Sequence, residues 1–196
     1  MKIYFNYLTL LFLLVSGIIF SQTALDSLPL KASFNFGKSV AIFGLTITNY
    51  GVPGAGFSSL QGKSMQQQVD EADVFDIYIL WASTNDYTNN REVGSYTDYT
   101  EFDNYNTEKL TTQAGGINYC IKKIYEINPN ATIYFFTSSK AFNDRGAYDP
   151  FYSEGMVQHV NMQKMICALH GIPVLDQFLL GGYNIYNKDL FWGTKN

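Results

Sequence analysis

Two nearly continuous apolar runs constrain the fold of this chain more than any other feature. Val74–Ala82 (VFDIYILWA) and Ala131–Thr137 (ATIYFFT) are rich in β-branched and aromatic residues, which is typical of buried strands in a parallel sheet. Between them, Glu108–Ile127 places apolar residues at helical spacing and ends before Pro129. This order of strand, helix and strand predicts an α/β protein with a parallel sheet.

The N-terminal side of this unit contains a further strand. Ser39–Gly44 (SVAIFG) is interpreted as buried, and Thr46–Tyr50 continues in β-branched and aromatic residues. Asn49 follows Gly44 by only five residues, whereas a crossover between parallel strands takes at least about 10–12 residues. Because no typical turn pair suggests a hairpin, we expect one long strand from Val40 to Tyr50 or two pieces broken by Gly44.

The remaining segments complete an alternating pattern. They are a glycine-rich turn at Gly51–Gly56, a short helix at Ser64–Ala72, a long surface loop at Tyr87–Asn106, a helix at Met156–Leu169 closed by Gly171, and a strand at Ile172–Leu175. We expect helices to cover both faces of the sheet. Ligands of such sheets gather at the carboxyl ends of the strands, which here lie at Gly44, Tyr50, Ala82–Asp86, Thr137–Lys140 and Asp176.

The first residues have the pattern of an export signal. Lys2 precedes an apolar run from Leu8 to Phe20, which small and polar residues follow at Ser21 and Gln22. This run is shorter than the roughly 20 residues that span a bilayer, which favours a cleaved signal peptide over an anchor. We therefore expect a signal peptide at 1–21, a single domain at 22–196, no stable membrane anchor after cleavage, and a periplasmic or secreted protein.

Composition excludes several classes of function. A net charge of -4 and a pI of about 5.1 argue against a nucleic-acid partner, which requires a concentrated basic surface. No histidine and cysteine spacing suits a metal site, and no cofactor is predicted. Cys120 and Cys167 lie among apolar residues in helical patterns, which favours buried free thiols, although a disulfide between them stays open.

Three stretches at the predicted strand ends resemble a known family. They are Ser39–Gly44, Asn49-Tyr50-Gly51-Val52-Pro53-Gly54 and Trp81-Ala82-Ser83-Thr84-Asn85-Asp86. In this order they are similar to the first three blocks of the SGNH (GDSL-type) hydrolases. The resemblance runs from Ser39 to about Tyr186. It implies a three-layer α/β/α, flavodoxin-like domain whose family activity is ester hydrolysis.

The resemblance also implies roles for two residues. The backbone N–H of Gly54 and the side chain of Asn85 would form an oxyanion hole, which stabilises the developing negative charge of acyl transfer. Each residue has a structural alternative. Asn85 is equally consistent with an Asx turn that ends the strand, and Gly54 with a loop position of positive φ.

The chain departs from the family where the reacting groups should stand. After Phe43-Gly44 there is no serine turn and no first crossover helix, and Asp189 has Trp192 in place of the histidine of the family's Asp-x-x-His block. His159 lies inside a helical pattern, and His170, at a helix end, is interpreted as a capping cation or a solvated residue. We therefore identify no catalytic residue and expect an incomplete fold that lacks the first crossover helix and the C-terminal helix.

Three functions follow from these observations. In the first, the chain is an inactive member of an ester hydrolase family whose ligands include acetyl esters of carbohydrates and other esters. In the second, it is a carbohydrate-binding module built on this fold. In the third, it is the non-functional product of a truncated gene. For binding, the candidate residues are aromatic and polar side chains of the strand end and the following loop, namely Trp81, Ser83, Asp86, Tyr96 and Tyr99.

Overall fold

The structure analysed is a computed structural model, which describes residues 40–42, 45–60, 62–139 and 154–182. The chain divides into two compact units, Met1–Tyr50 and Gly51–Asn196. The expected signal peptide at 1–21 and the Asp189 region lie outside the described residues.

The first unit contains a β-hairpin. β1 (Val40–Ile42) and β2 (Leu45–Ile47) pair antiparallel, with Val40 opposite Ile47 and Ile42 opposite Leu45. The expected single long strand is therefore wrong, and so is the exclusion of a hairpin, whereas the alternative of two separate strand pieces is confirmed. An antiparallel pair needs only two connecting residues, which is the number between Ile42 and Leu45.

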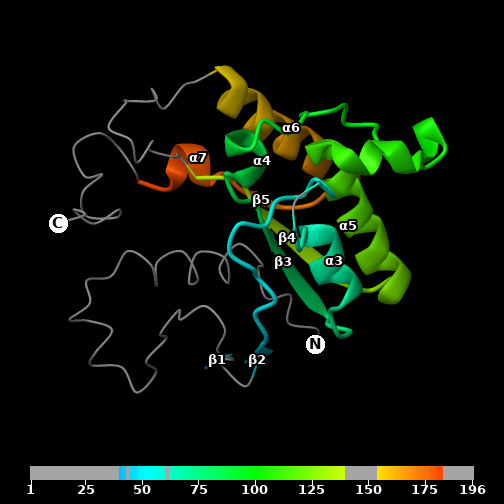
Figure 1. The fold of residues 1–196 in the computed structure, drawn as a ribbon. Helices are drawn as coiled ribbons and strands as arrows, with labels where there is room; N and C mark the ends of the chain where they lie inside the picture. The colour runs from blue at the N-terminus through cyan, green and yellow to red at the C-terminus, as the bar shows by residue number, and fades with distance from the viewer. Residues whose placement is uncertain (1–39, 43–44, 61, 140–153, 183–196) are drawn as a thin grey trace. The chain divides into compact units, whose positions relative to one another are not determined.

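The second unit is built around a parallel sheet of three described strands. β3 (Ile77–Trp81), β4 (Thr132–Phe136) and β5 (Val174–Leu175) lie in the order β3-β4-β5, as Figure 1 shows. In the register, Ile77 pairs with Thr132 and Phe135 pairs with Val174. The three strands predicted from composition are confirmed, and so is the α/β class.

The predicted helices are also found, with altered ends. α3 spans Met65–Asp70, α5 spans Gln113–Ile127 and α6 spans Glu154–His170. α5 begins later than the expected Glu108, because the Thr112 side chain caps it by accepting a hydrogen bond from the Gly115 N–H. α6 ends before Gly171, which has φ +64°, the left-handed conformation that commonly follows a helix.

The expected long loop at Tyr87–Asn106 is more ordered than its polar sequence indicated. It starts within α4 (Asn85–Thr88) and contains a 3₁₀ helix at Glu101–Asp103, and a second 3₁₀ helix follows at Thr107–Thr111. The first 3₁₀ helix has a capping box between Thr100 and Asp103. Local side-chain capping, rather than apolar periodicity, stabilises these turns.

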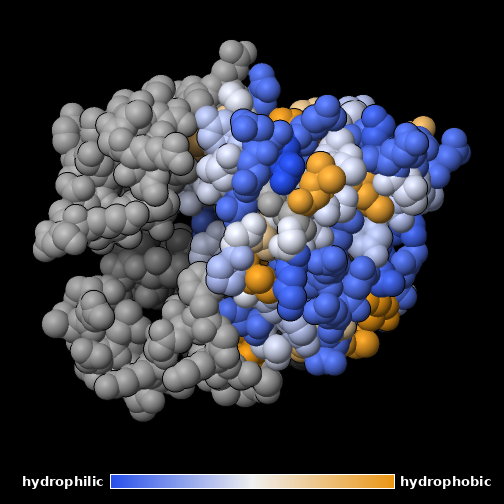
Figure 2. Space-filling view, viewed as in Figure 1, coloured by the Kyte–Doolittle hydropathy of each residue, from blue (hydrophilic) through white to orange (hydrophobic). Residues whose placement is uncertain are grey.

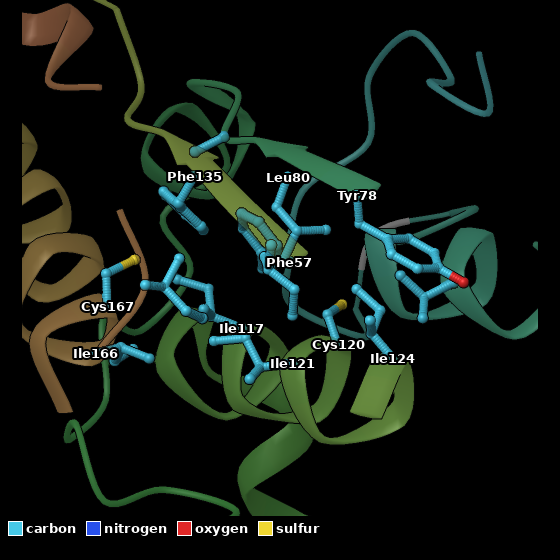
Figure 3. Close-up of a cluster of buried hydrophobic side chains, with 14 of the residues drawn as sticks. Phe57, Tyr78, Leu80, Ile117, Cys120, Ile121, Ile124, Phe135, Ile166 and Cys167 are labelled. Atoms are coloured by element: carbon cyan, nitrogen blue, oxygen red, sulfur yellow. The ribbon is translucent and has the colours of Figure 1, made fainter. Parts of the chain in front are cut away.

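One face of the sheet forms the hydrophobic core. Figure 3 shows side chains of β3 and β4 pointing toward α5 and α6. The buried contributors are Phe57, Tyr78, Leu80, Ile117, Cys120, Ile121, Ile124, Ile133, Phe135, Ile166 and Cys167. Both cysteines are free and buried, as their apolar neighbours predicted. Burial raises the pKa of both thiols, that of Cys167 to about 12, so both are unreactive thiols at neutral pH.

The opposite face of β3 is exposed. Ile77, Ile79 and Trp81 are 46%, 54% and 54% exposed, while Tyr78 and Leu80 between them are buried. No described helix covers this face of β3, which is consistent with the expected incomplete α/β/α fold that lacks its first crossover helix. α5 and α6 both belong to crossovers that add strands in one direction, and right-handed crossovers in one direction place their helices on one face.

The surface of the described residues is mainly polar in the view of Figure 2, with small separate apolar patches. None of the described helices is long and apolar enough to cross a bilayer.

Candidate functional site

The carboxyl ends of the three strands carry the polar residues that the sequence singled out. β3 runs into Ala82–Asp86, β4 into Thr137 and Ser138, and β5 into Asp176, which caps the short helix α7 (Gln177–Leu180). Because the strands are parallel, these ends meet at one edge of the sheet. The glycine-rich segment before Phe57 reaches the same edge through hydrogen bonds to Ser83 and Asn85.

Asn85 and Ser83 bind the same backbone carbonyl. The Asn85 Nδ2 amide donates to the Ala55 carbonyl at 2.8 Å and to Ser83 Oγ at 3.1 Å. The Ser83 hydroxyl donates to the same Ala55 carbonyl at 2.6 Å, and its Oγ also accepts from the Asn85 N–H at 3.2 Å. Both protons of the Asn85 amide are thus donated within the protein. The last contact is an ST turn, in which Ser83 Oγ accepts the N–H group two residues further on, and the Asx turn expected of Asn85 stays a prediction.

Gly54 is the other residue of the predicted oxyanion hole. It has φ +81°, and a side chain built on it would meet no atom within 4 Å, so the loop needs glycine here for its backbone conformation rather than for space. Gly54 directly precedes Ala55, whose carbonyl holds Ser83 and Asn85. The two residues of the predicted oxyanion hole therefore lie on segments that are hydrogen-bonded to each other. Their role as an oxyanion site stays a prediction.

Asp86 is a buried structural clamp in this conformation. Its side chain is 1% exposed, and its two carboxylate oxygens accept the N–H groups of Phe57 at 2.8 Å and Ser58 at 3.0 Å. Burial raises the pKa of Asp86, while the two backbone hydrogen bonds and Arg91 act in the opposite direction. A Cβ on Gly56 would lie 2.6 Å from an Asp86 oxygen. The sequence suggested ligand contact for Asp86, but its acceptors are occupied by the protein backbone.

The end of β4 is cross-linked to its neighbours by a second network. The Ser138 hydroxyl donates to the Ser83 carbonyl at 2.6 Å, and the buried Gln163 of α6 holds both the N–H and the hydroxyl of Ser138. At the end of β5, Asp176 accepts from Lys164 at 3.0 Å and from the Leu179 N–H. These bonds join three strand ends into one rigid edge.

The two histidines are engaged elsewhere. His159 Nδ1 lies 3.0 Å from Gln113 Oε1, and burial lowers the pKa of this ring to about 4, so it is neutral at pH 7. His170 Nε2 lies 2.9 Å from Asn118 Oδ1, and partial burial lowers its pKa. His170 is exposed to solvent, in line with its interpretation as a solvated residue, whereas the lowered pKa disfavours the charged form that a capping cation needs.

Among the described residues, no serine hydroxyl is hydrogen-bonded to a histidine ring. Ser58, Ser83 and Ser138 each donate to a backbone carbonyl. A serine nucleophile needs a base that accepts its proton, and the base needs an orienting partner. The contacts His159–Gln113 and His170–Asn118 were not predicted, since they join residues 46 and 52 positions apart and have no local sequence signal.

The candidate binding residues do not form one surface. Ser83 and Asp86 bind the backbone of the glycine-rich segment. Trp81 packs against Phe136 on the exposed face of β3, whereas the ring of Tyr99 packs against Tyr119 of α5, which lies on the other face of the sheet. In the described ranges, no three His, Cys, Asp or Glu side chains gather in a way that could hold a metal ion.

Comparison with known proteins gives relatives by structure only. No family model matches the sequence, and no curated protein matches it. A protein from Lactobacillus plantarum has a TM-score of 0.60 and 17% identity, over 74% of this chain and 68% of its own. This similarity is one of fold.

Two lipases are also among the similar structures. A possible lipase from Chitinophaga pinensis is 25% identical with a TM-score of 0.48, over 58% of this chain and 47% of its own. A GDSL-like lipase from Bacteroides ovatus is 20% identical with a TM-score of 0.46, over 62% of this chain and 53% of its own. The chain thus spans about half the length of these two lipases.

Proposed function

We propose that this chain is an exported SGNH-hydrolase-like protein that does not hydrolyse esters. The single observation that carries the proposal is the hydrogen bonding of three serine hydroxyl groups, two of them at the strand ends. Ser83, Ser138 and Ser58 each donate their hydroxyl proton to a backbone carbonyl within 2.6 Å. A hydroxyl in such a bond is a structural donor, and no imidazole among the described residues accepts its proton.

Two further features support the proposal. Both amide protons of Asn85 are donated to Ala55 and Ser83, so an oxyanion would have to compete with bonds that hold the loop in place. His159 is neutral and bound to Gln113, an amide that cannot stabilise an imidazolium as a carboxylate does. The edge of the sheet is built for rigidity rather than for proton transfer.

The direct test is esterase activity of the purified protein. We expect no saturable turnover of 4-nitrophenyl acetate or acetylated xylan above a heat-denatured sample. We also expect no labelling by a fluorophosphonate probe, which reacts only with an activated serine. Saturable turnover that Ser83→Ala abolishes would refute the proposal. Ser95→Ala is the matched control, because Ser95 lies in an exposed loop and bonds only with near neighbours.

Export is the second part of the proposal. It rests on Lys2, the apolar run from Leu8 to Phe20 and the small residue Ser21, which together have the order of a signal peptide. Cell fractionation followed by N-terminal mass spectrometry is expected to find a mature chain that begins near Gln22 in the periplasm or the medium. A full-length chain in the cytoplasm would contradict it.

The ligand implied by the resemblance is an acylated carbohydrate or another ester. It would lie at the strand ends, beside Gly54 and Asn85. Binding without turnover is measurable with a non-hydrolysable phosphonate analogue of an acetyl ester. Under the present proposal Asn85→Ala weakens such binding, whereas Asn89→Ala, an exposed change in the same helical turn, leaves it unaltered.

A further inference from the structure

We infer that a cleft on the outer side of α5 binds an uncharged sugar unit of a polysaccharide, at a site separate from the strand ends. The cleft has a volume of about 200 Å³. We call it the tyrosine cleft, and its lining residues are Tyr99, Tyr119, Lys122, Lys123 and Glu126. This inference does not rest on the proposed loss of esterase activity.

The position of the cleft follows from the periodicity of α5. Ile117, Ile121 and Ile124 face the sheet and are fully buried, as Figure 3 shows. Positions 119, 122, 123 and 126 fall on the opposite side of a helix with 3.6 residues per turn. They therefore present one tyrosine, two lysines and one glutamate outward, where Tyr99 of the preceding loop meets them.

The aromatic wall of the cleft is preorganised. The Tyr99 ring packs against Tyr119 with centroids 5.5 Å apart and edge-on against Tyr105 at 5.7 Å. Tyr99 and Tyr105 both have positive φ, of 56° and 53°, which is costly for bulky residues and persists only where the surroundings enforce it. Asp103 enforces it at Tyr99 by accepting the Tyr99 N–H at 2.9 Å.

The loop that carries Tyr99 is also fixed to α5. Asn118 of α5 donates to the carbonyls of Tyr96 and Asp98 at 3.0 and 2.7 Å. The Thr112 cap donates to the Asp98 carboxylate at 2.9 Å. A wall held in this way loses little conformational entropy when a ligand binds, which favours affinity.

The charges around the cleft balance. Lys122 pairs with Glu126 and lies 5.0 Å from the centre of the Tyr105 ring. Lys123 lies 3.8 Å from Asp70, which is longer than a hydrogen bond, and Tyr119 donates its hydroxyl to the same Asp70 at 2.7 Å. Two ammonium groups thus face two carboxylates, and the cleft selects neither an anion nor a cation.

This chemistry fits an uncharged sugar. Ring faces pack against the apolar C–H face of a sugar, and hydroxyl groups both donate and accept hydrogen bonds, so they match ammonium and carboxylate groups equally. The volume is below the roughly 300 Å³ at which pockets for drug-sized ligands begin, which limits the cleft to one ring of a longer chain. A charged sugar would meet a like charge in the cleft.

The test is binding of soluble polysaccharides by the purified protein in affinity gel electrophoresis and calorimetry. The probes are two uncharged polymers, arabinoxylan and a mixed-linkage glucan, and the acidic polymer polygalacturonate. We expect retardation by at least one uncharged polymer, and Tyr99→Asn to weaken it about tenfold. Asparagine tolerates positive φ, so this variant removes the ring while the loop keeps its conformation.

The matched control is Phe102→Asn. Phe102 is 68% exposed in the same loop but does not line the cleft, so its substitution is expected to leave binding unchanged. Thermal melts of both variants within a few degrees of the parent verify folding. Absence of binding to both uncharged polymers, preference for polygalacturonate, or equal loss in both variants would overturn the inference. Activity on acetyl esters bears only on the proposed function, so the sugar-binding inference and the proposed loss of esterase activity can each fail without the other.

Discussion

Truncating two adjacent residues of β3 measures how differently the two faces of the sheet are covered. Leu80 is 4% exposed and belongs to the core, whereas Ile79 is 54% exposed on the opposite face. Leu80→Ala removes buried methyl groups and leaves a cavity, so we expect a loss of about 2–5 kcal/mol in the free energy of unfolding. Ile79→Ala leaves no cavity. Because about half of the Ile79 side chain is exposed, we expect the free energy of unfolding to fall by about half of a side-chain transfer energy, which is roughly 1 kcal/mol or less.

Chemical denaturation followed by tryptophan fluorescence and circular dichroism gives both values. The denaturant slope should match the parent in each variant, because neither change alters the surface exposed on unfolding. A parallel thermal melt is expected to shift by about 2–4 °C per kcal/mol. If Ile79→Ala costs as much as Leu80→Ala, the outer face is covered in solution and the reasoning from a single covered face is wrong.

Three further predictions concern the buried polar groups and two glycines. Because the pKa of His159 is lowered to about 4 from an unfolded value near 6.5, the unfolded chain binds more protons between these values. The free energy of unfolding should therefore fall by up to about 3 kcal/mol as the pH drops from 6.5 to 4, and stay level above 6.5. Denaturation across this range checks it, and the slope should be clearly smaller in His159→Gln, where only the lowered pKa of His170 still contributes. Asp86→Asn keeps only one acceptor for two buried N–H groups, so it should lower stability by about 1–3 kcal/mol in the same assay at pH 7; an unchanged midpoint would contradict the clamp. Gly116→Ala places a Cβ 2.0 Å from the Phe57 carbonyl oxygen and should lower the free energy of unfolding by about 1–3 kcal/mol or more. The Cβ of Gly54→Ala meets no atom, so this variant should lose only about 1 kcal/mol through backbone strain. Equal losses in the two variants would contradict the packing around Gly116.

The sequence was sufficient for the elements and their order. Val74–Ala82 and Ala131–Thr137 were recognisable as strands because composition alone distinguishes a buried strand from a loop. Their continuous apolar character gave no indication that only one face of β3 is covered, because the side chains at Ile77 and Ile79 are as apolar as those that pack in the core. Coverage depends on which helices return to which face, and that is a property of the topology.

The candidate site was predictable in location but not in the roles of its residues. The expectation that functional residues gather at the carboxyl ends of parallel strands placed Ser83, Asn85 and Asp86 correctly at one edge of the sheet. This expectation could not show that the Asp86 carboxylate is occupied by backbone groups 28 and 29 positions away. The tyrosine cleft was missed for a related reason, since Tyr99 and Tyr119 meet only because the loop is bound to α5.

The handedness of the crossovers determines which face of the sheet the described helices cover. The connections β3–α5–β4 and β4–α6–β5 add strands in one direction, so their helices share one face. A helix on the other face requires a crossover that adds a strand beyond β3, in the opposite direction. The exposure of Ile77, Ile79 and Trp81 therefore follows from the direction of the two described crossovers rather than from the chemistry of β3, and the comparison of Ile79→Ala with Leu80→Ala tests that topology as well as the strand.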